Sequence, residues 1–154
     1  AMSNRVASAI EGRFVHGFTW SHHAVGAAVG STVLRRLRQD NLVEAAAARG
    51  ARLLEALTAS LDDHPHVGDV RGVGLLVAVE LVADRATKRP FPRSDRVAEQ
   101  ATAAAKHHGL LVYPSAGCAD GVNGDLLLLG PPLVIDDAEV DLVVSRLTEA
   151  LVGF

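Results

Sequence analysis

The run from Leu75 to Val82 constrains the fold most, because it is almost continuously apolar and has Glu80 as its single charged member. A run of this length, bounded by Gly74 and Asp84, is typical of a buried strand, since helices usually need ten or more residues. Two shorter apolar runs, Leu110 to Tyr113 and Leu126 to Leu129, predict further strands. The chain must therefore build a sheet and cover it.

The segments around these runs have helical spacing. We predict four helices, over Ala24–Arg38, from Asn41 to about Leu61, from Ser94 to Gly109, and from Asp136 to the end of the chain. Asn41 with Glu44 three residues later resembles a capping box. Helices that alternate with short strands predict a small α+β domain, with a sheet covered by helices, over residues 24–154.

Residues 1–23 fit this scheme poorly, because they mix charged and small residues with only a weak helical stripe. We predict that this segment belongs to a neighbouring cofactor domain or to a subunit interface. A length of 154 residues suits one compact domain. The composition, 49% hydrophobic but only 4% aromatic, indicates a globular core of Ala, Val and Leu.

Several classes of function are excluded by composition. No apolar run reaches the roughly 18–20 residues that span a bilayer, and the first residues lack a signal-peptide pattern. A net charge of −3 with scattered arginines does not favour nucleic-acid binding. The single Cys118 suits a reducing compartment. We expect a cytoplasmic protein that binds neither membranes nor nucleic acid.

The histidines and nucleophiles form no recognisable catalytic motif. His16, His22 and His23 cluster in sequence, as do His107 and His108, but no carboxylate accompanies them at metal-ligand spacing. The sequence also lacks the GxSxG, GxGxxG and P-loop patterns. We therefore predict no metal site and no catalytic residue in this chain.

Two other residues are candidates for ligand contacts. Thr19 precedes a predicted helix, so its hydroxyl can cap the helix or donate to a bound phosphate, and spacing alone favours the cap. Arg71 follows the apolar Val70 and cannot be neutralised, so it should face a carboxylate or a ligand. An ion pair with a carboxylate such as Glu80 is the simpler interpretation.

Three groups of residues carry a resemblance to a known family. They are His16-Gly17-Phe18-Thr19-Trp20-Ser21 followed by His23, Val70-Arg71-Gly72-Val73-Gly74-Leu75 leading into Glu80-Leu81, and Gly124-Asp125 followed by Pro131-Pro132-Leu133-Val134-Ile135. In this order and spacing they resemble the class III aminotransferases over nearly the whole chain. The loop from Tyr113 to Asp125 is similar to the subgroup of ω-transaminase-like proteins and aspartate aminotransferase family proteins.

The resemblance implies the small C-terminal domain of a fold-type-I enzyme that uses pyridoxal 5'-phosphate. Such enzymes are usually homodimers in which both subunits contribute to each active site. Thr19 matches the threonine that reaches the cofactor phosphate of the partner subunit. Phe18 matches the preceding position, which lines the same contact between the subunits. Arg71 matches an arginine that receives the substrate carboxylate in some members. The implied substrates are a small amine or amino acid and a keto acid.

The chain also departs from the family pattern. His22 and Ala24 replace a glycine and a proline common there, and an arginine expected before the Pro-Pro segment is missing. The lysine that binds the cofactor covalently lies upstream of the threonine segment, before Ala1. Lys88 and Lys106 are not credible substitutes, because we expect both to stay protonated.

We therefore expect the C-terminal part of an aminotransferase, inactive by itself, whose partner is a large cofactor domain or a second subunit. One alternative is a non-catalytic remnant that acts through protein–protein contacts, and another is an unrelated α+β domain whose motifs match by coincidence.

Overall fold

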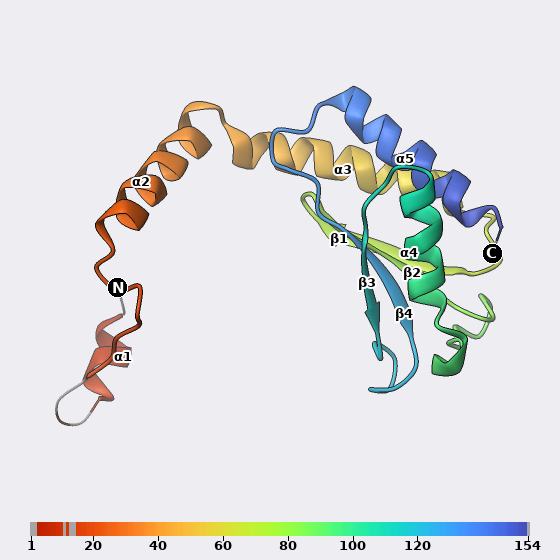
Figure 1. Ribbon diagram of the computed structural model, residues 1–154, viewed down its shortest axis with the longest axis horizontal. Coiled ribbons are helices and arrows are strands. Elements are labelled where there is room, and N and C mark those ends of the chain that lie inside the picture. Colours follow the sequence, from red (N-terminus) through yellow and green to blue (C-terminus); the bar gives the residue numbers. More distant parts are fainter. Residues whose placement is uncertain (1–2, 11, 13–14, 154) are drawn as a thin grey trace. The chain divides into compact units, whose positions relative to one another are not determined.

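The computed structural model describes residues 3–10, 12 and 15–153 of the chain. Contacts divide the chain into two compact units, residues 1–36 and 37–154. The first unit contains α1 (Asn4–Ser8) and most of α2 (Ala24–Gln39) (Figure 1). Neither helix has a buried residue. Among the described residues, those that form the hydrophobic core all belong to the second unit.

The second unit is an antiparallel sheet with helices. Its strands lie in the order β1-β2-β4-β3, so β1 and β3 form the two edges. The helical elements are α3 (Leu42–Leu61), a short 3-10 helix (Arg93–Asp95), α4 (Val97–His107) and α5 (Asp137–Leu151). The strands are β1 (Val67–Val73), β2 (Leu76–Leu81), β3 (Tyr113–Ala116) and β4 (Asp125–Leu129).

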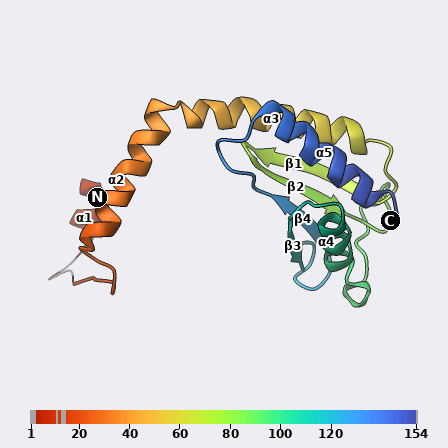
Figure 2. The same ribbon diagram turned by 45° about the horizontal axis from the view of Figure 1, so that its top comes forward.

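The two faces of the sheet differ because side chains alternate along each strand. In β2, Val77, Val79 and Leu81 are buried, and they face the helices. Leu76, which points to the other face, is 64% exposed. Figure 2 shows α3 and α5 side by side on the covered face. No helix within residues 37–153 covers the opposite face, which we call the open face.

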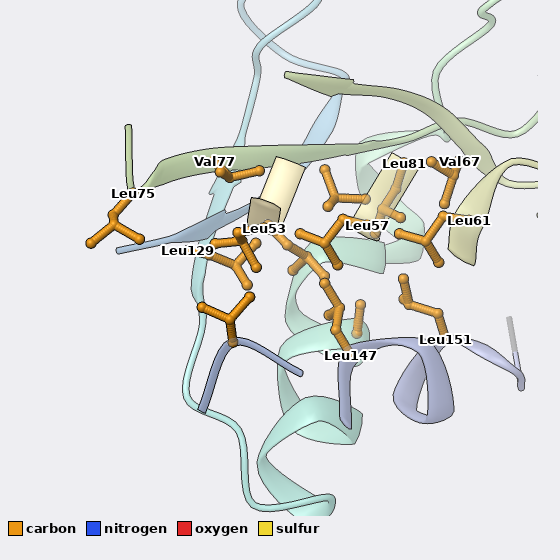
Figure 3. Packing of buried hydrophobic residues seen from close by; sticks show 14 of the residues in the cluster. Leu53, Leu57, Leu61, Val67, Leu75, Val77, Leu81, Leu129, Leu147 and Leu151 are labelled. Carbon is orange, nitrogen blue, oxygen red and sulfur yellow. The ribbon is translucent and has the colours of Figure 1, made fainter. Parts of the chain in front are cut away.

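The core lies between the sheet and the helices (Figure 3). Helix α3 contributes Leu53, Leu57 and Leu61 at the spacing of one helical face, and all three are buried. They meet Leu147 and Leu151 of α5 and the buried strand residues. Each leucine buried in this way contributes roughly 1.5–3 kcal/mol, so this leucine cluster holds the helices on the sheet.

One glycine allows α3 to approach the sheet closely. A Cβ atom at Gly50 would lie 2.1 Å from the carbonyl carbon of Gly74, in the turn between β1 and β2. No side chain fits at this distance, and the obstacle is backbone rather than a mobile side chain. Gly50 is therefore required for this packing.

The predicted helices are largely confirmed, but the cap predicted at Asn41 is wrong. Asn41 does precede α3, yet it has a left-handed backbone with φ of 50°, and its side chain makes no capping bond. A capping box is present instead at α5, where the Asp136 carboxylate accepts from the Glu139 amide at 2.8 Å. A residue pair at the right spacing forms a box only if the first residue has an extended backbone.

The strands show where the apolar pattern was sufficient. Strands β2 and β4 confirm the predictions from Leu75–Val82 and Leu126–Leu129. The third strand lies at Tyr113–Ala116 rather than Leu110–Tyr113, and it includes Pro114 because edge strands tolerate proline. Strand β1 was not predicted, since its glycines and charged residues hide the alternation. The α+β class is confirmed.

Within the described residues, no helix is both long and apolar enough to cross a membrane.

Candidate functional site

Phe18 and Thr19 lie in a closed turn before α2. The Phe18 amide donates to Ser21 Oγ at 2.9 Å, and the Ser21 amide donates back to the Phe18 carbonyl at 2.9 Å. Thr19 and Trp20 lie between these two bonds, and both are exposed. The turn therefore presents the Thr19 hydroxyl on a short, hydrogen-bonded loop.

Thr19 does not cap the helix, so the predicted capping role is wrong. Helix α2 begins at Ala24, and the capping side chain is that of His23, whose Nδ1 accepts from the Gly26 amide at 3.0 Å. Spacing misplaced the cap because the turn inserts four residues between Thr19 and the helix. The Thr19 hydroxyl is consequently not needed for the helix start.

Aromatic rings are edge-on to one another around this turn. The Phe18 and His16 centroids are 4.5 Å apart at an interplanar angle of 87°, and those of Trp20 and His23 are 4.9 Å apart at 87°. Phe18 is nevertheless 71% exposed and Trp20 73% exposed. These rings offer apolar surface that the described part of the chain does not cover.

Arg71 belongs to the other unit, at the centre of a charged cluster on the open face of the sheet. Its Nη1 donates to Asp69 Oδ2 at 2.8 Å and to Glu80 Oε2 at 2.6 Å. These bonds raise the pKa of Arg71 above its ordinary value, the bond to Asp69 first and that to Glu80 second. The ion pair predicted from the sequence is present, because Asp69 and Glu80 are directly opposite across β1 and β2.

A shallow groove of about 430 Å³ continues from Arg71 along the open face. Apolar side chains form most of its lining, and Leu76 and Leu128 are two of them. The open face is thus charged at one end and apolar at the other. A molecule or surface with both characters would match it.

Neither lysine has the surroundings that covalent cofactor binding needs. Lys88 is exposed, and its Nζ donates to the carbonyl of Gly68. Lys106 is exposed in the last turn of α4. A nucleophilic lysine is normally desolvated in an apolar pocket or placed beside another cation. Among the residues that the structure describes, no group of three or more His, Cys, Asp or Glu side chains is placed to hold a metal ion.

Asp125, which belongs to one of the motifs of the family resemblance but had no role predicted from the sequence, is an unusual group. It is 1% exposed, its Oδ1 accepts from the Ala98 amide in the first turn of α4 at 3.1 Å, and its Oδ2 has no partner among the described residues. Burial raises the pKa of this carboxyl. The signal in the sequence was a charged residue directly before the apolar run of β4.

Arg93 does not neutralise Asp125 by direct contact. Its guanidinium forms a two-pronged bond with Glu99, Nη1 donating to Oε2 at 3.1 Å and Nη2 to Oε1. This pair lowers the pKa of Glu99 to about 2. Arg93 is thus engaged by Glu99, and the contact that Asp125 makes is with the Ala98 amide, which joins β4 to the start of α4.

Comparison with known proteins defines the class. The family model of the class III aminotransferases matches residues 1–151. The chain belongs to the class III aminotransferase family. An aminotransferase of Gibberella zeae is 39% identical over 98% of this chain, and the putrescine–pyruvate aminotransferase of Pseudomonas aeruginosa is 34% identical over 91%. The chain spans only 30% and 29% of these two relatives.

Solved structures agree with this assignment. An (S)-enantioselective omega-transaminase from Thermomicrobium roseum superposes with a TM-score of 0.83 at 35% identity, over 98% of this chain and 32% of its own. A Bacillus anthracis aminotransferase gives a TM-score of 0.85 at 33% identity, over 98% of this chain and 34% of its own. These neighbours confirm the fold as part of a fold-type-I transferase.

The family implies pyridoxal phosphate, and the residues of this chain fit one end of it. Thr19 is exposed, and its hydroxyl does not cap α2, so the hydroxyl can donate to a phosphate oxygen. The aldehyde end requires an amine that neither Lys88 nor Lys106 provides in its exposed position. The chain therefore suits phosphate contact and not covalent attachment.

Proposed function

We propose that this chain is the C-terminal part of a pyridoxal-phosphate-dependent aminotransferase, which transfers an amino group between an amine or amino acid and a keto acid. The observation that carries the proposal is the family match over residues 1–151 of a chain that spans about 30% of its relatives. The remaining residues of such an enzyme, including the covalent lysine, would come from a cofactor domain.

In this proposal Thr19 and Phe18 act on the cofactor side of the site. The cofactor, when bound, supplies an electron sink for the reacting carbon. The Thr19 hydroxyl donates to its phosphate, and the exposed ring of Phe18 lines the adjoining surface and excludes water from it. Both residues serve the active site of a partner subunit in a homodimer.

Arg71 acts on the substrate side. A guanidinium carries five N–H donors, and among the described residues only those on Nη1 take part in hydrogen bonds. Nη2 and Nε remain able to receive a substrate carboxylate side by side, while Asp69 and Glu80 fix the plane of the group. A higher KM for the keto acid in an Arg71→Gln enzyme, with cofactor affinity unchanged, would support this role.

The chain by itself is not catalytic in this proposal, because both of its lysines are exposed and lack the setting of a nucleophile. The decisive experiment supplies a cofactor domain with its lysine and measures pyridoxal phosphate affinity from the cofactor absorbance. Thr19→Val should weaken binding roughly tenfold or more, because a hydrogen bond to a charged group is lost.

Matched variants separate the hydroxyl from other effects. Thr19→Ser keeps the hydroxyl and should bind the cofactor nearly as the wild type does. Thr32→Val alters an exposed threonine of α2 whose hydroxyl donates only to the Ala28 carbonyl, and it should have no effect. Equal cofactor affinity in Thr19→Val and wild type would refute the phosphate contact.

A second candidate is a non-catalytic domain that acts through protein–protein contacts, and the exposed face of α2 is compatible with it. Helix α2 exposes Val25, Val29 and Val33 along one face, at 66%, 57% and 51% exposure. Exposed apolar surface of this kind drives association in either case. Cofactor behaviour distinguishes the two, because a remnant would ignore pyridoxal phosphate even beside a lysine-bearing domain.

A further inference from the structure

His23 occupies a helix position that histidine seldom fills. It directly precedes α2, its carbonyl accepts the first helical bond from the Ala27 amide at 2.9 Å, and its Nδ1 accepts from the Gly26 amide at 3.0 Å. The usual residues here are Ser, Thr, Asp and Asn, whose side-chain oxygens accept from the same third helical amide. His23 therefore caps α2 with a ring nitrogen.

The chain makes room for this ring. A Cβ atom at Gly26 would lie 3.0 Å from His23 Nδ1, which is tighter than ordinary packing. A glycine at the third helical position lets the imidazole reach the amide without being displaced. Because Nδ1 accepts a hydrogen bond, the proton of the neutral ring is on Nε2.

Four contacts connect the cap to the turn that contains Thr19. The ring of Trp20 is edge-on to that of His23, and the His23 amide donates to the Trp20 carbonyl at 3.3 Å. The pair of bonds between Phe18 and Ser21 then closes the turn on its other side. Thr19 lies inside this series, so its backbone is held from the helix through His23 and Trp20.

We propose that His23 is a positioning residue that fixes Thr19 for contact with the cofactor phosphate. The inference rests on the proposed function, because it presupposes that Thr19 makes this contact. Without the cap, the first turn of α2 frays, and the Thr19 turn samples conformations that cannot bind. The apparent affinity for the cofactor then falls in proportion to the fraction of molecules whose turn can still bind the phosphate.

A double-mutant cycle tests the inference in the enzyme assembled from this chain and its cofactor domain. The dissociation constant of pyridoxal phosphate is measured for the wild type, His23→Ala, Thr19→Val and the double variant. His23→Ala should weaken binding about fivefold, the scale of one lost helix cap. It should have almost no effect in the Thr19→Val background, because there is no hydroxyl left to position.

Rescue and control variants identify the cap as the cause. His23→Asn should restore the wild-type affinity, since asparagine is among the most favourable capping residues. His22→Asn changes the neighbouring histidine, whose φ of 60° asparagine tolerates, and should leave affinity unchanged.

Different results would overturn different claims. Unchanged affinity in Thr19→Val refutes the phosphate contact itself. If Thr19→Val weakens binding but His23→Ala does not, or if His23→Ala weakens it equally in both backgrounds, His23 does not position Thr19.

Amide exchange in the isolated 154-residue chain gives an independent check. The cap is supported if the Gly26 amide exchanges at the same rate in wild type and His23→Asn but faster in His23→Ala. The cap is refuted if the Gly26 amide exchanges at the same rate in His23→Ala as in wild type.

Discussion

Helices α2 and α3 follow one another in the chain and have similar apolar stripes, yet they end in opposite environments. Leu34 of α2 is 57% exposed, whereas Leu57 of α3 is fully buried. Helix α3 packs on β1 and α5, and its buried face includes Gly50 and three leucines. Helix α2 has no buried residue.

The difference shows that an apolar stripe specifies a helix that can pack, and not the surface against which it packs. Most of the stability of a helix in a protein comes from packing of that stripe rather than from intrinsic propensity. Helix α3 meets this requirement inside its own unit. Helix α2 keeps its stripe available, and the proposed enzyme would use that surface in contacts with the cofactor domain or a second subunit.

The largest expected effect compares leucine-to-alanine changes in the two helices. Leu57→Ala should destabilise the second unit by roughly 2–5 kcal/mol, because it removes buried methyl groups and leaves a cavity. Leu34→Ala should change the free energy of unfolding by less than about 0.5 kcal/mol, as exposed positions do. Urea denaturation of both variants measures the contrast. Similar losses would mean that Leu34 is buried in solution.

Glycine-to-alanine substitutions in α3 and α2 should change stability in opposite directions. Gly50→Ala places a methyl group against the Gly74 backbone and should cost about 1–3 kcal/mol. Gly30→Ala meets nothing within 4 Å and should stabilise α2 by up to about 1 kcal/mol, through helix propensity. Circular dichroism and denaturant midpoints report both changes. A destabilising Gly30→Ala would indicate a surface close to α2.

The packed unit also contains a buried charge. Burial raises the pKa of Asp125 in the folded state, so its contribution to stability is fully present below the unfolded pKa of about 3.9 and is lost as pH rises through the folded pKa. Asp125→Asn keeps an oxygen for the Ala98 amide and removes the charge. Its stability relative to wild type should therefore increase as pH rises above about 4.

Asp120 provides a control of opposite sign. Hydrogen bonds from Asn123 and from the Val122 amide lower the pKa of this exposed carboxyl, the Asn123 bonds most. Its contribution is present above the unfolded pKa and is lost as pH falls through the folded one. Asp120→Asn should thus be destabilising at neutral pH and approach wild-type stability in acid. The same pH trend in Asp120→Asn and Asp125→Asn, measured by urea denaturation, would contradict this assignment.

The smallest effect concerns the junction between the two helices. Asn41 has φ of 50° and makes no capping bond, so Asn41→Gly should change stability by only a few tenths of a kcal/mol. Asn41→Ala should cost about 1 kcal/mol, because alanine resists the left-handed backbone. Thermal unfolding of the two variants compares them directly. Equal stability would show that this residue is not left-handed in solution.

Much of the fold could be predicted where the pattern was local. Strand β2 was found from eight consecutive residues, and the buried leucines of α3 were found from their spacing. Strand β1 escaped because its burial depends on β2, which pairs Asp69 with Glu80 and allows Gly72 and Arg71 inside a strand. The cap predicted at Asn41 was wrong for a similar reason, since residue spacing does not predict the backbone conformation at the junction of two helices.

The candidate site was predicted less completely. Thr19, Phe18 and Arg71 were singled out mainly by resemblance, and their roles remain proposals. The ion pair between Arg71 and Glu80 followed from the need of a charge for a partner. Asp125 and His23 were quoted as motif residues, but their structural roles were not predicted, because these roles depend on amides of α4 and of the first turn of α2.

The sequence by itself determined that this chain forms amphipathic helices and a short-stranded sheet, because periodicity is a local property set by backbone geometry. It also determined the family, through motifs that keep their order. Only the tertiary structure decided which stripe is buried, that Asp69 joins Glu80 at Arg71, and which side chain caps α2. Burial, ion pairing and capping depend on atoms brought together by the fold, and a linear pattern does not place those atoms in space.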